Sequence, residues 1–174
     1  LKGFENRLVF LPTPAAEFWS DDVSPDARDV WLAAADGTRA HARYLPGPAD
    51  RGAVLVSHGN GGNLSLLNQF ARNLRESLGR GVLLYDYPGY GKSDGAPTEA
   101  GCYAAGDAAY EWLTGPGGVP ADEVVLFGES LGGGVATDLA SRHDHAALVL
   151  VYTFTSLPDA AAAHHPWAPC RLLM

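Results

Sequence analysis

The chain has 174 residues, a net charge of −8 and a sequence pI of about 5.0. This length is enough for a hydrophobic core, and we expect residues 1–174 to form a single domain. The acidic balance argues against a nucleic-acid partner, which requires a basic surface. No run of residues approaches the roughly 18 apolar residues that a membrane-spanning helix needs.

The predicted elements alternate between strands and helices. The dipeptide Asp36-Gly37 separates the first two strand-like segments and is a strong hairpin signal, so we predict an antiparallel pair there. The predicted strands are Asp29–Ala34, Thr38–Leu45, Ala53–Ser57, Gly81–Tyr85, Glu123–Phe127 and Ala146–Val151, and the predicted helices are Leu64–Leu78, Thr98–Leu113 and Leu131–Arg142. The last four strands are continuous apolar runs, typical of strands buried on both faces. The fold class is therefore α/β, with a mostly parallel, doubly wound sheet and an antiparallel N-terminal hairpin.

One serine lies at a junction between a predicted strand and a predicted helix. In "VVLFGESLGGGVA", Ser130 follows the strand and opens the helix. A turn this sharp strains the backbone and lifts the hydroxyl above the sheet. It also brings strand and helix close together, so the positions two before and two after must be small, and they are Gly128 and Gly132. The pattern predicts that Ser130 is a catalytic nucleophile.

A second glycine-rich motif, "SHGNGG", follows the strand Ala53–Ser57. Glycines at such a strand end let the backbone approach a ligand. One N–H of this loop could pair with the N–H after Ser130 to bind an oxyanion. The alternative is a plain glycine-rich loop before a helix. We expect His58 to shape this turn rather than to act as a general base.

Other motifs are excluded as cofactor or metal sites. The segment "DYPGYGKS" ends like a phosphate-binding loop, but Asp86 stands where that loop needs glycine. A dinucleotide fingerprint fails at Leu64. "HDH", His143 to His145, lies at a helix end and is interpreted as a solvated cap. Cys102 and Cys170 lie in no metal or redox spacing and are interpreted as ordinary small apolar residues. We expect no metal and no cofactor.

Together, "HGNGG", "YDYPGYGKSDG" and "GESLGGGVA", each after a strand and in this order, resemble the α/β-hydrolase superfamily. The resemblance covers about residues 6–174. The resemblance extends to a serine-hydrolase subgroup, the alpha/beta-hydrolase-domain proteins, through the segments "RLVFLPTP", "DYPGYGKS" and "VYTFTSLPDAA". Some members of this subgroup are membrane-anchored depalmitoylases. The resemblance implies hydrolysis of an ester, thioester or amide through an acyl-enzyme. Carried over by position, Ser130 is the nucleophile, the N–H groups of Asn60 and Leu131 form the oxyanion hole, and Glu129 and Tyr87 line the site.

The chain departs from the family pattern after the serine. The family places an acid and then a histidine on later loops, but 44 residues follow Ser130 in the 174-residue chain. The candidates there are Asp159, His164 and His165, which we interpret as ordinary exposed polar residues. We therefore expect a C-terminally truncated, incomplete hydrolase core that is weak or inactive alone, because a serine without a base is a poor nucleophile. The alternative is a non-catalytic hydrolase-fold module that binds a ligand or partner.

Two expectations about partners follow from the chain's ends. The last predicted strand would present an open apolar edge, which favours self-association. The first residue is Leu1, so an anchoring segment could precede it and attach the protein to a membrane. Localisation is left open between cytoplasmic and membrane-associated, with a small-molecule or acyl substrate as the expected ligand.

Overall fold

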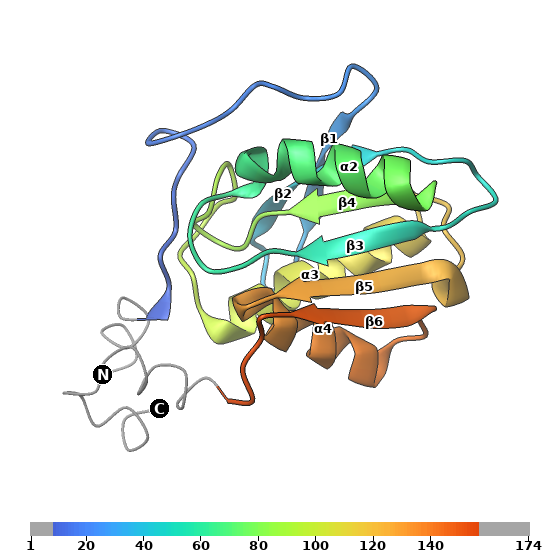
Figure 1. Cartoon of the computed structure of the whole chain (residues 1–174). Helices are drawn as coiled ribbons and strands as arrows, with labels where there is room; N and C mark the ends of the chain where they lie inside the picture. The colour runs from blue at the N-terminus through green and yellow to red at the C-terminus, as the bar shows by residue number, and fades with distance from the viewer. Residues whose placement is uncertain (1–8, 157–174) are drawn as a thin grey trace.

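The computed structural model describes residues 9–156, and these contain a six-stranded sheet with the strand order β1-β2-β4-β3-β5-β6 (Figure 1). The strands are β1 (Arg28–Ala33), β2 (Arg39–Leu45), β3 (Ala53–Ser57), β4 (Gly81–Tyr85), β5 (Val124–Glu129) and β6 (Ala147–Val151). Strands β1 and β2 form the predicted antiparallel hairpin, and β2 is also antiparallel to β4. The pairs β3–β4, β3–β5 and β5–β6 are parallel. The predicted fold class is confirmed.

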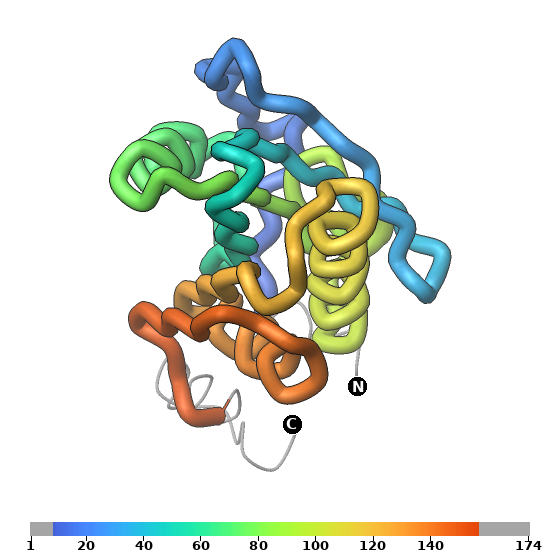
Figure 2. Tube along the Cα trace, turned by 90° about the vertical axis from the view of Figure 1, so that its right-hand side faces the viewer, coloured from blue at the N-terminus to red at the C-terminus, as the bar shows by residue number. Residues whose placement is uncertain are grey.

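Helices cover both faces of the sheet. The helices are η1 (Leu64–Leu67), α2 (Asn68–Leu78), α3 (Glu99–Thr114), η2 (Ala121–Glu123) and α4 (Leu131–Arg142). Helix α2 lies on one side of the strands, and helices α3 and α4 lie on the other (Figures 1 and 2). This arrangement is the doubly wound one that the alternating elements predict.

Two hydrophobic clusters fill the space between the helices and the sheet. Strands β3 and β4 are buried along their whole length, and successive residues of a strand point to opposite faces. Leu55 and Leu83 accordingly belong to the cluster that includes residues of α3 and α4, whereas Val54 and Val82 belong to the cluster that includes residues of α2. The two central strands thus hold the carboxyl edge of the sheet firmly in place.

The predicted burial of the last strand is wrong. Val149 and Leu150 of β6 are 40% and 42% exposed. Strand β6 pairs only with β5 among the described residues, and α4 packs against it from one side. A continuous apolar run predicts a buried strand only where helices cover both faces, and that condition is not met here.

The predicted helix Leu64–Leu78 is divided in the structure. Asn63 caps the 3₁₀ turn η1 by accepting a hydrogen bond from the Ser65 amide through its side chain at 3.1 Å, and α2 begins afterwards at Asn68. The cap predicted at Thr98 is present, since its hydroxyl accepts from the Gly101 amide at 2.9 Å.

Of the two cysteines, only Cys102 lies within the described residues. Cys102 is buried in the core, as expected of a small apolar residue. Cys170, Asp159, His164 and His165 all lie beyond residue 156. Across residues 9–156, none of the helices combines the length and the apolar character that crossing a membrane requires.

Candidate active site

Three loops meet at the carboxyl edge of the sheet, where the parallel strands β3, β4 and β5 end (Figure 1). They are the loop His58–Asn63 after β3, the segment Asp86–Tyr90 after β4, and the turn at Ser130 after β5. Ligands of open α/β sheets bind at this edge, because loops from neighbouring strands converge there.

The backbone at Ser130 is strained. Ser130 stands between β5 and α4 with φ 48° and ψ −112°, a conformation that non-glycine residues rarely adopt. Its N–H donates to the Val151 carbonyl at 2.9 Å. Its own carbonyl accepts from the Gly133 amide at 3.0 Å and from the Thr153 hydroxyl at 3.1 Å. The turn is therefore held by strand β6, by helix α4 and by the residues after β6.

Two glycines allow the chain to pack closely around this turn. A Cβ atom at Gly128 would lie 2.6 Å from the Gly132 carbonyl oxygen, and one at Gly132 would lie 2.0 Å from the Ser57 carbonyl oxygen. No side chain fits at either distance. The first contact joins β5 to α4, and the second joins α4 to the end of β3.

The loop His58–Asn63 lies beside the serine. A Cβ atom at Gly59 would lie 3.7 Å from the Cβ of Ser130. The next residue, Asn60, has a fixed side chain: its Oδ1 accepts from the Leu11 amide at 2.9 Å and from the Tyr90 hydroxyl at 2.8 Å. On the other side, Leu131 is the first residue of α4, so its N–H has no acceptor within the helix. The loop that carries the Asn60 amide and the first residue of α4, which carries the Leu131 amide, thus both lie next to Ser130.

A small cavity of about 40 Å³ lies next to this turn, between the first turns of α3 and α4. Its lining is mostly apolar and consists of Phe10, Glu99, Cys102, Tyr103, Leu131, Gly134, Val135 and Phe154. Burial, assisted by the Glu99 carboxylate, raises the pKa of the Cys102 thiol to about 12. A thiol with this pKa is neutral at pH 7 and is no nucleophile, so Cys102 does not compete with the serine.

Tyr87 does not line the site as the resemblance implies. Its side chain is fully buried beneath the loop, and its hydroxyl donates to the His58 carbonyl at 2.8 Å. Burial raises the pKa of this hydroxyl well above its usual value, with the neighbouring Tyr85 adding to the shift. Tyr87 is therefore a hydrogen-bond donor that supports the loop from below.

No histidine among residues 9–156 is hydrogen-bonded to Ser130. His58 is buried, with its Nδ1 atom 2.8 Å from the Gly59 carbonyl oxygen, which agrees with a role in shaping the turn. His143 lies at the other end of α4, where its Nε2 atom is 3.0 Å from an Asp107 oxygen and its ring stacks on Tyr110. The same part of the chain holds no group of three His, Cys, Asp or Glu residues that could bind a metal.

Sequence reasoning gave no role to Asp86 or Tyr90, although both contact the loop beside Ser130. The signal was present in "DYPGYGKS", where polar side chains directly follow a buried strand. The spacing of this segment resembles only a phosphate-binding loop, and side chains that support a neighbouring loop follow no fixed spacing in a sequence.

A doubly wound sheet with a strained serine turn between a strand and a helix is typical of α/β hydrolases. Comparison with known proteins supports this class, since a family model described as alpha/beta hydrolase fold matches residues 52–169. The chain belongs to this alpha/beta hydrolase family.

Curated relatives match nearly the whole chain. An uncharacterized protein of Mycobacterium tuberculosis is 42% identical over 176 residues, which cover 98% of this chain and 61% of that protein. The alpha/beta hydrolase domain-containing protein WAV2 of Arabidopsis thaliana is 32% identical, covering 96% of this chain and 57% of its own length. The chain thus spans about three fifths of the length of these relatives.

Solved structures show the same fold. An alpha-beta hydrolase from Vibrio vulnificus superposes with a TM-score of 0.71 at 27% identity, covering 80% of this chain and 50% of that chain. An esterase from Pyrococcus furiosus superposes with a TM-score of 0.64 at 19% identity, covering 77% of this chain and 52% of that chain. The second likeness bears on the fold alone.

Proposed function

We propose that the protein is a serine hydrolase that cleaves an ester, thioester or amide through an acyl-enzyme, with Ser130 as the nucleophile. The Ser130 hydroxyl oxygen attacks the substrate carbonyl, its proton passes to a general base, and the bond to the leaving group breaks. Water then attacks the acyl-serine and releases the acid. The N–H groups of Asn60 and Leu131 bind the negative oxygen of each tetrahedral intermediate.

The observation that carries this proposal is the backbone conformation of Ser130. A φ of 48° places Ser130 in a strained backbone conformation that a serine in an ordinary turn does not adopt. The close approach at Gly128 and Gly132 holds the residue in this conformation between strand and helix. The cavity beside Leu131 has a mostly apolar lining, which suits an acyl or alkyl group.

We infer that the general base comes from outside residues 9–156, because each of the four described histidines contacts other groups and none is hydrogen-bonded to Ser130. A serine without a base loses several powers of ten in rate. The leaving group of p-nitrophenyl acetate departs without a general acid, so this ester tests the nucleophile with few demands on other residues. Imidazole added to the buffer can act as a general base.

The experiment measures nitrophenolate release by the purified chain, with and without imidazole. We expect slow release that imidazole accelerates, and we expect Ser130→Ala to lose the protein-dependent signal. Ser141→Ala is the matched control, since Ser141 lies at the far end of the same helix and its hydroxyl donates to the Asp138 carbonyl. Equal rates for wild type and Ser130→Ala would contradict the proposal and favour a non-catalytic hydrolase-fold module.

A further inference from the structure

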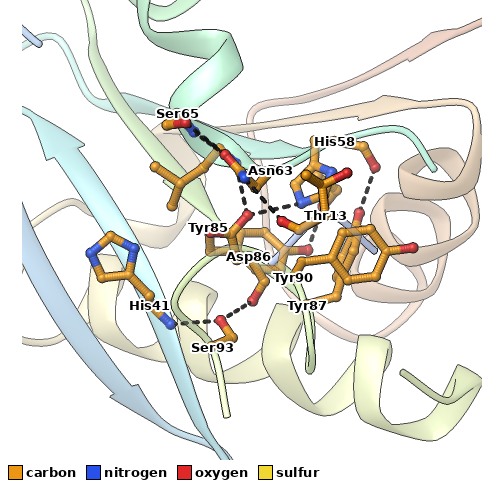
Figure 3. A network of polar contacts seen from close by, with 12 residues as sticks. Thr13, His41, His58, Asn63, Ser65, Tyr85, Asp86, Tyr87, Tyr90 and Ser93 are labelled. Carbon is orange, nitrogen blue, oxygen red and sulfur yellow. Dashed lines mark hydrogen bonds and ion pairs between the residues drawn. The ribbon is translucent and has the colours of Figure 1, made fainter. Parts of the chain in front are cut away.

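The segment Asp86–Tyr90, which the proposed chemistry does not use, lies against the loop His58–Asn63 (Figure 3). Three of its side chains contact that loop or the residue after it. The segment is itself fixed by β2, because the Asp86 amide donates to the His41 carbonyl at 2.9 Å. The Ser93 hydroxyl adds a second link: it donates to the Asp86 carbonyl and accepts from the His41 amide, both at 2.9 Å.

The Asp86 carboxylate contacts both ends of the loop. Its side chain is fully buried. Atom Oδ1 accepts a hydrogen bond from the Leu64 amide, at the end of the loop, at 2.7 Å. The same atom lies 3.5 Å from Nε2 of His58, at the start of the loop. One carboxylate therefore spans the loop that carries Asn60.

The His58 ring lies between the Gly59 carbonyl and the Asp86 carboxylate. The Gly59 carbonyl can only accept, so the Nδ1 atom of His58, 2.8 Å away, is the donor. The Nε2 atom on the other side of the ring lies 3.5 Å from Oδ1 of Asp86. Replacing the Asp86 carboxylate would therefore alter the contacts at both ends of the loop at once.

Two tyrosines complete the support. The Tyr87 hydroxyl donates to the His58 carbonyl at 2.8 Å. The centroid of the Tyr87 ring lies 4.4 Å from that of the His58 ring. The Tyr90 hydroxyl donates to Oδ1 of Asn60 at 2.8 Å. Burial raises the pKa of both hydroxyls, so both keep the proton that they donate.

We propose that Asp86, Tyr87 and Tyr90 are positioning residues that fix the Asn60 amide beside Ser130. This inference rests on the proposed function, because the positioned amide matters only for an oxyanion formed at Ser130. The three contacts act on the start, the middle and the end of one loop, and all three come from the segment after β4. Hydrogen bonds at three points of one buried loop restrict it to one geometry.

The test uses single hydroxyl removals, which leave the packing nearly unchanged. Tyr87→Phe and Tyr90→Phe each remove one donor to the loop. Tyr110→Phe is the matched control, because the Tyr110 hydroxyl also donates to a backbone carbonyl, that of Asp144 at 2.6 Å, far from the loop. Asp86→Asn removes the charge, and Asp94→Asn is its control, since Asp94 pairs with Arg39 at the surface.

Two readouts are measured for every variant. The first is amide hydrogen exchange over residues 58–64, which does not depend on activity. The second is the rate of Ser130 acylation by p-nitrophenyl acetate, with kcat and KM determined separately. We expect faster exchange confined to residues 58–64 in the three loop variants, and a fall in kcat of about ten- to a hundredfold with KM unchanged. Both controls should match the wild type.

Three outcomes would overturn the inference. Exchange over residues 58–64 that equals the wild type in Tyr87→Phe and Tyr90→Phe would show that the segment does not hold the loop, whether or not Asp86→Asn folds. Faster exchange with an unchanged kcat would show that the loop's position is irrelevant to the chemistry. Wild-type protein that forms no acyl-serine would overturn the proposed function and the catalytic half of this inference, and exchange would then decide the structural half alone.

Discussion

The amide of Ser130 donates to the carbonyl of Val151 at 2.9 Å, so the end of strand β6 holds the turn that follows strand β5. This bond continues the parallel pairing of the two strands, in which Glu129 is the partner of Val151. A strained residue persists only where its surroundings over-determine it. The exposed edge strand therefore has a direct part in shaping the candidate active site.

The close approach at Gly132 predicts a large difference between two alanine substitutions in the same helix. Gly132→Ala places a Cβ atom 2.0 Å from the Ser57 carbonyl oxygen, and we expect a loss of roughly 1–3 kcal/mol in the free energy of unfolding. Gly134→Ala meets nothing within 4 Å and should stabilise α4 by about 1 kcal/mol. Urea denaturation measures both values, and equal effects would show that the packing at Gly132 is looser than described.

The backbone strain at Ser130 predicts that two variants without the hydroxyl differ in stability. Ser130→Gly removes the hydroxyl and relieves the positive φ, whereas Ser130→Ala removes the hydroxyl alone. We expect the glycine variant to be more stable than the alanine variant by about 1 kcal/mol. Thermal unfolding of the two variants checks this, and an alanine variant as stable as the glycine variant would argue against backbone strain.

Stability should fall in mild acid because of His41. Burial lowers the pKa of this histidine, and the nearby carboxylates of Asp29 and Asp86 oppose the shift without reversing it. A lowered folded pKa gives stability that is fully present above the unfolded value of 6.5 and is lost as the pH falls through the folded value. Lys92, which also faces the ring, acts in the same direction as burial.

The measurement is the free energy of unfolding at several pH values between 7.5 and about 5. His41→Gln keeps a donor for Asp29 but does not titrate, so its stability should depend less on pH over this window. The control is His145→Gln, which removes a half-buried histidine between α4 and β6, away from Asp29 and Asp86. An identical pH dependence in wild type and His41→Gln would contradict the assignment.

The open edge of β6 predicts self-association. Val149 and Leu150 are exposed, and the outer edge of β6 has no strand partner among the described residues. Leu150→Lys should shift the protein toward monomer in analytical ultracentrifugation, because a charge on an edge strand opposes pairing with a second copy. Leu66→Lys, at a residue 53% exposed on η1, is the control and should not. A wild-type protein that stays monomeric at all concentrations would refute this expectation.

Local signals in the sequence were enough for most of the fold. Asp36-Gly37 predicted the hairpin, Thr98 predicted a helix start, and the bounds of α4 agree with Leu131–Arg142. The open edge of β6 was predicted, but the exposure of its face was not, because this depends on which helices pack against the strand and not on its own apolar residues. The break after Leu67 was hidden because η1 and α2 share one helical periodicity.

The site was only partly accessible from the sequence. The glycines around Ser130 mark a close approach of backbones, which leaves a local pattern that can be read. The Asp86 contact leaves none, since it joins a carboxylate to an amide 22 residues away and depends on the order of β3 and β4 in the sheet. Contacts of this kind become visible only when the strands have been placed side by side.

Tandem mass spectrometry of the digested protein, after reaction with p-nitrophenyl acetate, locates the acyl group and so tests whether Ser130 is the nucleophile. We expect an acetyl group on Ser130 that builds up with the release of nitrophenolate and is removed faster when imidazole is added. Acetyl groups found only on surface lysines or other residues, with Ser130 unmodified, would contradict this expectation.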